Sequence, residues 1–275
     1  MYYYDYHVHT TNSTDGKDTL MDVCQSAISK GVKEIAITDH FEPTQVNQEY
    51  VFYQPELFFK EIEEARQIFK GLLVIKYGVE LGQPHIYPIY SEKLINEYPF
   101  DFVLASAHKI KGDVDFGDID YTQANRSFYM QKYIDSLYEL VQWGKFDCLA
   151  HFDLIKRYCA RSGIKINLIE EYEEKITEIL KEVIKKGKGI EVNTSGLRQY
   201  SAGLMPDWDI LSLYKKLGGT HLTIGSDAHS APEIGAGFQE TVELLKKLGY
   251  KTVTLYKKRK PYEIAFSEYT NGKSA

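Results

Sequence analysis

Short apolar runs alternate with amphipathic segments along most of the 275-residue chain. Seven of the apolar runs have the length and residue types of buried strands. They cover residues 2–8, 32–38, 72–80, 100–107, 146–150, 189–193 and 221–226. Between them, apolar residues recur at helical spacing, which predicts helices at residues 19–31, 55–71, 125–144, 167–187, 207–218 and 238–249. This regular alternation predicts an α/β fold built on a parallel sheet.

The polar residues in this pattern gather at the carboxyl ends of nearly every predicted strand. In a closed barrel those ends converge on one mouth. A nucleotide-binding open sheet would instead carry a glycine-rich loop after its first strand, and no such loop follows residues 2–8. We therefore expect a TIM-like barrel formed by a single domain over residues 1–275. The longest non-helical stretches, residues 40–54 and 108–124, are expected to be functional loops.

Composition narrows the class of protein. A hydrophobic content of 43% is enough for a substantial core, and a net charge of −6 gives no strong field for nucleic acid. Cys24, Cys148 and Cys159 have no CxxC spacing, which indicates reduced thiols. No stretch approaches the ~20 apolar residues of a membrane span, and the N-terminus lacks a signal-peptide pattern. We expect a cytoplasmic protein with no nucleic-acid or membrane partner, and the oligomeric state is left open.

The basic segment 257–266, preceded by a short final strand, is interpreted as a solvated edge of the molecule.

The first predicted strand places two histidines, His7 and His9, side by side, because residues i and i+2 of a strand point the same way. Polar residues follow every later strand as well. Together the strand ends supply His7, His9, Asp15, Asp39, His40, Glu80, His108, His151, Glu191, Asn193, Asp227 and His229. Any one of these histidines alone is more often structural than a ligand. Six of the chain's eight histidines at such positions, with carboxylates beside them, are hard to explain by packing.

Imidazoles and carboxylates are ligands for zinc, iron and manganese, and no cysteine occupies one of these positions. The set is too large for a single ion, so we expect a cluster of two or three divalent transition-metal ions. The two oxygens of Glu80 make it the natural bridge between two of them. Metals held about 4 Å apart polarise a shared water and clamp a transferring group, which is hydrolytic chemistry on a charged ester.

In chain order, the motifs "HVHT", "TDH", "GVE", "SAH", "AH", "IEVN" and "SDAH" resemble those of the polymerase-and-histidinol-phosphatase (PHP) family. The resemblance runs from residue 2 to about residue 230, and "NTSGLR" and "RKPY" are similar to the histidinol-phosphate phosphatase branch. It implies a distorted (β/α)7 barrel with a trinuclear metal centre. The implied ligands are His7, His9, Glu80 and Asp227 for one metal, Glu80, His108 and His151 for a second, and Asp15, His40 and His229 for a third. Asp15 stands where some relatives have histidine.

The resemblance also implies a phosphomonoesterase that hydrolyses L-histidinol phosphate to L-histidinol and inorganic phosphate in histidine biosynthesis. A hydroxide bridging two metals would attack phosphorus in line with the leaving alkoxide, and Asp15 or a metal-bound water would protonate that alkoxide. The expected catalytic residues are Asp15, Glu80, Asp227 and His229.

Phosphate is also expected to contact side chains that donate hydrogen bonds, above all guanidinium groups, which bind two oxygens at once. Arg161, in the loop after residues 146–150, and Arg198, just after residues 189–193, are placed to reach the mouth of the barrel. For either arginine a surface salt bridge is the alternative interpretation. The expected substrate-binding residues are Arg161, Arg198, Lys109, Asn193 and Ser195, of which Lys109 is a weaker candidate.

Further polar residues near this set are given supporting roles. Asp39 and Glu191 are expected to orient ligand histidines by accepting their second N–H, and Asp153 either does the same or recognises an amine. His85 lies in a loop beyond Glu80, off the pattern. His221 begins the last strand of the barrel, at its opposite end, and is therefore expected to be structural.

Two alternative functions stay open. The first is a phosphoesterase or nuclease of the same family that acts on another ester, although the acidic charge disfavours a nucleic-acid backbone. The second is an inactive metal-binding barrel, against which the complete ligand set argues. Amidohydrolases also carry HxH on their first strand, but typically place a lysine where this chain has Glu80. Metal-dependent release of phosphate would separate these alternatives.

Overall fold

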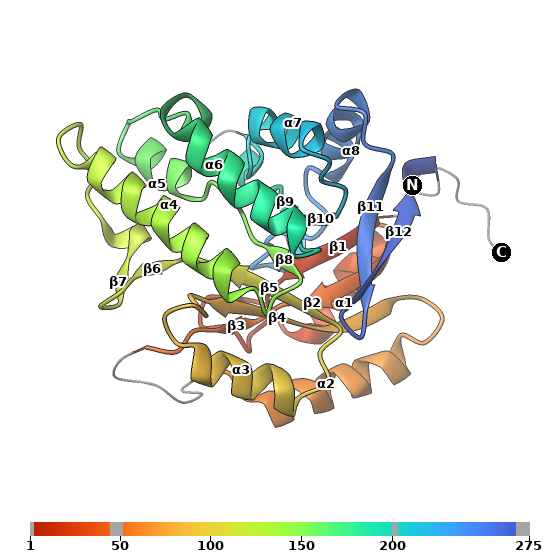
Figure 1. Ribbon diagram of the computed structural model, residues 1–275. Coiled ribbons are helices and arrows are strands. Elements are labelled where there is room, and N and C mark those ends of the chain that lie inside the picture. Colours follow the sequence, from red (N-terminus) through yellow and green to blue (C-terminus); the bar gives the residue numbers. More distant parts are fainter. Residues whose placement is uncertain (1–2, 45–51, 200–202, 268–275) are drawn as a thin grey trace.

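A computed structural model describes residues 3–44, 52–199 and 203–267 (Figure 1). Its central sheet has, in spatial order, β1 (Tyr3–Val8), β2 (Val32–Ile37), β4 (Val74–Gly82), β5 (Phe102–Ser106), β8 (Cys148–Leu149), β9 (Gly189–Asn193) and β10 (Leu222–Gly225), all paired in parallel. The short strand β3 (His40–Phe41) also pairs with β4. A bridge between Val8 and Ala228 brings the two ends of the sheet together. The predicted TIM-like barrel of seven strands is confirmed in this nearly closed form.

Helices flank the sheet on the outside of the barrel. They are α1 (Leu20–Ser29), α2 (Pro55–Ile68), α3 (Pro88–Glu97), α4 (Arg126–Trp143), α5 (Ile155–Arg161), α6 (Leu168–Lys185), α7 (Trp208–Lys216) and α8 (Phe238–Lys247), with short 3-10 turns η1 (Phe116–Asp118), η2 (Ser195–Arg198) and η3 (Ala231–Glu233). Every residue of β5 and β9 is buried, as expected for parallel strands covered on both faces. Within the described ranges, no helix combines the length and apolarity needed to cross a membrane.

Local sequence chemistry explains where several helices begin and end. Thr19 caps α1 in a capping box with Asp22, and Pro55 opens α2. Asn167 accepts hydrogen bonds from the first backbone N–H groups of α6. At the other end of α4, Gly144 adopts the left-handed conformation that stops a helix. These signals are readable in the sequence, so the predicted helix bounds agree closely with the observed ones.

Three segments differ from the predictions. Helix α3 was not expected, because its buried residues, Ser91, Leu94 and Ile95, form too short an apolar stripe. The segment after β8, predicted as a loop, contains α5. The stretch 108–124 contains a small hairpin of β6 (Lys109–Ile110) and β7 (Val114–Asp115). Of the predicted loop 40–54, residues 45–51 lie outside the described residues.

A C-terminal antiparallel hairpin closes the amino end of the barrel. It consists of β11 (Thr252–Lys257) and β12 (Lys260–Ala265). Its backbone joins the barrel where Tyr256 N donates to Tyr6 Oη at 2.9 Å and where Thr254 Oγ1 accepts from Leu222 N at 3.1 Å. The basic segment expected to be a solvated edge therefore includes a strand, although much of β12 is exposed. His221 lies 3.1 Å from Glu263 of this hairpin, in agreement with its predicted structural role.

Candidate metal centre

The side chains predicted as metal ligands lie together at the carboxyl end of the barrel, below a cavity of about 420 Å³. The cluster comprises His7, His9, Asp15, His40, Glu80, His108, His151, Asp227 and His229. Its residues differ in their exposure to solvent. His7 and His9 are fully buried at its floor, whereas the Asp15 side chain at the rim is 53% exposed.

A first group of ligand-type atoms joins the first strand to the last. The Nε2 atoms of His7 and His9 face Oε2 of Glu80 at 3.1 and 3.5 Å. The same two nitrogens lie 3.6 and 3.5 Å from Oδ1 of Asp227. Two imidazole nitrogens and two carboxylate oxygens therefore surround one point in the barrel.

A second group forms around the other oxygen of Glu80. Its Oε1 atom lies 3.3 Å from His108 Nε2 and 3.0 Å from His151 Nε2. The two nitrogens are 3.3 Å apart. Because each Glu80 oxygen belongs to a different group, this carboxylate has the geometry of a bridge.

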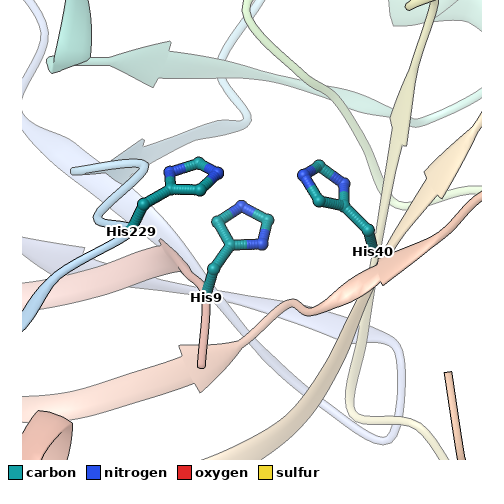
Figure 2. A group of neighbouring side chains, drawn as sticks. All are labelled: His9, His40 and His229. Atoms are coloured by element: carbon teal, nitrogen blue, oxygen red, sulfur yellow. The ribbon is translucent and has the colours of Figure 1, made fainter. Parts of the chain in front are cut away.

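A third group is looser and nearer the cavity. Asp15 Oδ2 lies 3.0 Å from His229 Nε2 and 3.7 Å from His40 Nε2. Figure 2 shows His9, His40 and His229 arranged around a common space, and their ligand atoms lie within 4.8 Å of one another. The Nδ1 atom of His40 is also 3.0 Å from Glu80 Oε2, so His40 lies between this group and the others.

The geometry fits metal ions. Two ligands of a tetrahedral ion with bonds of about 2.1 Å lie about 3.4 Å apart, close to the distances in the first and second groups. Hydrogen bonds alone leave His9 Nε2, a ligand-type atom of the first group, without a partner. Buried polar atoms normally have one. Nitrogen and carboxylate donors without thiolates suit zinc, manganese or iron.

The electrostatics of the cluster follow from the same crowding. Burial and the neighbouring rings of His229 and His40 lower the pKa of His9 to about 3, which keeps its ring neutral. Burial alone would lower the pKa of His108, yet the carboxylates of Glu42 and Glu80 raise it to about 10. Burial opposes ionisation of Glu80, but the surrounding histidines hold its pKa well below its usual range. Protons and metal ions therefore compete for some of these nitrogens.

Two carboxylates outside the ligand set, Glu191 and Asp39, orient histidines, as the sequence predicts. Glu191 Oε1 lies 2.6 Å from His7 Nδ1, and its other oxygen accepts from the backbone N–H of His151 at 2.8 Å. Asp39 acts less directly. It accepts from the Ser13 hydroxyl at 2.8 Å, and that hydroxyl is 3.1 Å from His9 Nδ1. Such contacts fix the ring orientation of a ligand histidine.

Asp5, which the sequence analysis did not single out, connects the two ends of the sheet. Its fully buried carboxylate accepts from the backbone N–H groups of Ser226 at 2.8 Å and Gly235 at 3.0 Å. Asp5 precedes His7 by two residues, and Ser226 immediately precedes Asp227, which has a left-handed φ of 52°. The carboxylate thus holds the segment that carries Asp227 against the strand that carries His7.

Two functional candidates near the cavity were missed. Glu42 bonds His108 Nδ1 and lies 3.0 Å from Lys109 Nζ. Its position two residues after His40 was a usable signal. Arg157 lines the cavity, with Nη1 4.0 Å from Asp227 Oδ2 and its guanidinium 5.2 Å from the Tyr158 ring centre. It could have been found only by recognising α5.

The predicted substrate-binding residues have varied positions. Lys109 lines the cavity. The guanidinium of Arg161 donates to the carbonyl of Gly117, and that of Arg198 donates to the carbonyl of Ser226 at 2.8 Å; neither arginine lines the cavity. Direct contact of these two arginines with phosphate stays a prediction.

The predicted neutral donors are buried beneath the ligands. Ser195 Oγ and Asn193 Nδ2 donate to Asp227 Oδ2 at 3.1 and 3.3 Å. Both side chains are fully buried. They are therefore placed to hold Asp227.

Two other predictions are refined. Asp153 forms a buried ion pair with Lys156 at 3.1 Å and accepts from Asp207 N at 2.9 Å, so it orients no ligand histidine. His85, expected off the pattern, is partly buried, and burial lowers its pKa to about 4.

The PHP domain family model matches residues 5–195. The chain belongs to this family. It is 31% identical to a probable histidinol-phosphatase of Clostridium acetobutylicum over 94% of this chain and 99% of that protein. It is 29% identical to a histidinol-phosphatase of Lactococcus lactis subsp. lactis, over 92% of this chain and 93% of the relative.

A solved structure extends this similarity of the PHP chain to three dimensions. The crystal structure of histidinol phosphate phosphatase from Lactococcus lactis subsp. lactis, complexed with zinc, L-histidinol and phosphate, superposes with a TM-score of 0.83 at 27% identity. The match covers 94% of this chain and 98% of that one. The predicted family and fold are therefore confirmed.

The bridging geometry predicts unequal metal loss from two variants. Glu80→Ala removes an oxygen from both the first and second groups, whereas His229→Ala removes a ligand-type nitrogen from the third group alone. We expect the Glu80 variant to lose about two metal equivalents and the His229 variant at most one, as expected for a bridging carboxylate. Elemental analysis after dialysis in manganese- or zinc-supplemented buffer measures this, with circular dichroism to verify folding. Equal metal content in the two variants would contradict a bridge.

The position of Asp5 predicts that Asp5→Asn weakens metal binding without removing a ligand. An amide in place of one oxygen would face backbone N–H donors and displace the Asp227 segment. Metal affinity should fall roughly 10–100-fold, as for other changes behind metal ligands. Asp147→Asn is the matched control, because Asp147 is buried and accepts from Val103 N at 2.8 Å at the amino end of the barrel. Chelator competition should separate the variants, and equal metal affinity in both would contradict the proposed bracing.

Proposed function

We propose that this chain is a metal-dependent histidinol-phosphatase, which hydrolyses L-histidinol phosphate to L-histidinol and inorganic phosphate in histidine biosynthesis. One observation carries the proposal. Three groups of ligand-type side chains lie beneath a single cavity in a chain that is similar, over nearly its whole length, to a phosphatase crystallised with zinc, L-histidinol and phosphate. The three cysteines are buried and free, which agrees with a cytoplasmic location.

The proposed cofactors are two to three divalent transition-metal ions, zinc, manganese or iron. His7, His9, Glu80 and Asp227 would hold one, and Glu80, His108 and His151 a second. Asp15, His40 and His229 would hold a third, which is the most exposed of the three sites. Divalent ions in such a cluster act as Lewis acids toward phosphoryl oxygens and activate water for attack.

Arg157 is the best placed cation for the phosphoryl group. It reaches into the cavity beside Asp227, and packing near Tyr158 limits its movement. A guanidinium can bind two phosphoryl oxygens and neutralise charge that develops during hydrolysis. Lys109 adds a second positive charge at the cavity wall, held by Glu42.

Asp15 and His229 are proposed to serve the leaving group. Their side chains meet at 3.0 Å at the cavity wall. Asp15, or a water held by a metal ion, would protonate the leaving alkoxide. The size of the cavity, about 420 Å³, suits a small ester. Its wall includes the carboxylate of Asp115, which would favour a cationic substrate body over a second phosphate.

A phosphate-release screen tests the proposed function. We expect turnover of L-histidinol phosphate to exceed that of sugar and nucleotide monophosphates, and to be lost after chelation and restored by manganese or zinc. Faster turnover of another ester would support a different phosphoesterase. No metal-dependent release from any ester, with full metal content, would support the inactive barrel.

The arginines predict a graded set of kinetic effects. A charge-assisted hydrogen bond contributes about 1.5–3 kcal/mol, so Arg157→Ala should lower kcat/KM for L-histidinol phosphate at least ~10-fold. Metal content should not change, and Arg157→Lys should recover only part of the activity. Arg161→Ala and Arg198→Ala serve as comparisons, since both guanidiniums bond backbone carbonyls. A larger loss in either of them than in Arg157→Ala would show that the phosphate lies elsewhere.

A further inference from the structure

A second cavity, of about 740 Å³, lies at the opposite end of the barrel from the metal cluster. Its walls are the end of α2, the first residues of β4, the segment before β5 and the turn between β11 and β12. We propose that this cavity is a binding site for a small phosphate ester with an apolar or aromatic body. The proposal is independent of the phosphatase activity.

The lining of this cavity is strongly basic. Six basic residues line the cavity, namely Arg66, Lys70, Lys76, Lys257, Lys258 and Arg259. Asp101 is the one acidic residue in this lining, and its side chain already accepts from Arg66 at 3.2 Å and from the backbone of Lys258 at 2.9 Å. A cavity with this excess of positive charge attracts an anion.

The basic residues fall into two classes. Three are ion-paired: Arg66 with Asp101, Lys76 with Glu34 at 3.4 Å, and Arg259 with Asp147 at 3.1 Å. The ammonium groups of Lys70, Lys257 and Lys258, by contrast, have no acidic partner in the described part of the chain. These three lysines are exposed and are thus available to a ligand.

The wall of the cavity is largely apolar, which argues for an organic ester over a free inorganic anion. Leu73, Ile95 and Phe100 contribute to it, together with the rings of Tyr77 and Tyr98. The volume falls within the roughly 300–1,000 Å³ typical of sites for small organic ligands. An apolar body would bury against this wall while its phosphate faces the lysines.

The turn that carries two of these basic residues has an unusual backbone. Lys258 and Arg259 have φ values of 50° and 62°, in the left-handed region that favours glycine or asparagine in two-residue hairpin turns. Two backbone hydrogen bonds to Asp101 hold the turn in this conformation: Lys258 N donates to its carboxylate at 2.9 Å and Arg259 N donates to its carbonyl at 2.8 Å. The cationic tip of the hairpin is therefore fixed beside the segment that leads into β5.

Binding of adenosine monophosphate to the full-length protein with its metals tests the proposal, with inorganic phosphate as the comparison. Calorimetry should show adenosine monophosphate binding to the wild type more tightly than inorganic phosphate. The triple variant Lys70→Glu, Lys257→Glu, Lys258→Glu should bind it at least ~10-fold more weakly, because it loses charge-assisted hydrogen bonds. A milder variant with glutamine at the same positions should show a smaller loss in the same direction.

The matched control is Lys181→Glu, Lys216→Glu, Lys247→Glu, which changes net charge equally at exposed lysines of α6, α7 and α8. It should bind adenosine monophosphate as the wild type does. Equal weakening in the control would show a general charge effect and overturn the proposal. Unchanged affinity in both cavity variants would place the nucleotide elsewhere, the metal centre included, and would also overturn it. So would the absence of binding to the wild type.

Discussion

The carboxylate of Glu80 is the constraint on which the site depends. It is buried to 1% exposure, and ring nitrogens of His7, His40, His108 and His151 lie 3.0–3.3 Å from its oxygens. A buried carboxylate without compensating charge is strongly unfavourable. Without metal ions, protonated imidazoles can supply the compensating positive charge. With metal ions bound, the ions supply it and the imidazoles that bind them are neutral. The same arrangement therefore couples metal binding to proton release.

The surrounding structure holds this arrangement through carboxylates that bond backbone N–H groups. Glu191 joins His7 to the His151 segment, and Asp5 joins the first strand to the segment of Asp227. Gly225 permits the close approach, because a Cβ there would collide with His7 and Glu191. The left-handed conformation of Asp227 is maintained by this bracing, as is common where backbone strain serves a site. The ligands are thus positioned by the fold before any ion binds.

Much of the site could be predicted from the sequence because it depends on strand ends. The two-residue period of a strand places His7 and His9 together, and barrel closure brings residues as distant as Glu80 and Asp227 to the same point. The rest depends on features with weak sequence signals. Arg157 reaches the cavity through α5, a helix of only seven residues, which is too short for a clear periodicity.

Longer-range contacts were equally hidden. Glu42 becomes a partner of His108 only because the short strand β3 pairs with β4. Asp5 resembles any polar residue of an edge strand until the sheet closes and brings Ser226 to it. In the basic C-terminal segment, β12 has no alternation of buried and exposed side chains that would predict a strand, since its first four residues are all exposed. The local sequence pattern specifies the helices and strands, but these contacts depend on the tertiary packing of those elements.

The two ends of the barrel contribute differently to function and to stability. At the carboxyl end, ionisable side chains crowd together and some of their polar atoms, such as His9 Nε2, have no hydrogen-bond partner. At the amino end, the polar groups satisfy one another: Glu34 accepts from Tyr6 and Tyr262 and pairs with Lys76. The buried rings of Tyr6, Phe102 and Tyr256 pack 5.0–6.4 Å apart beside this network. Aromatic packing and satisfied hydrogen bonds of this kind stabilise the fold and offset the unfavourable electrostatics of the crowded ligand cluster. The hairpin that closes the amino end therefore supports the metal cluster through the stability of the fold, although it touches none of the ligands.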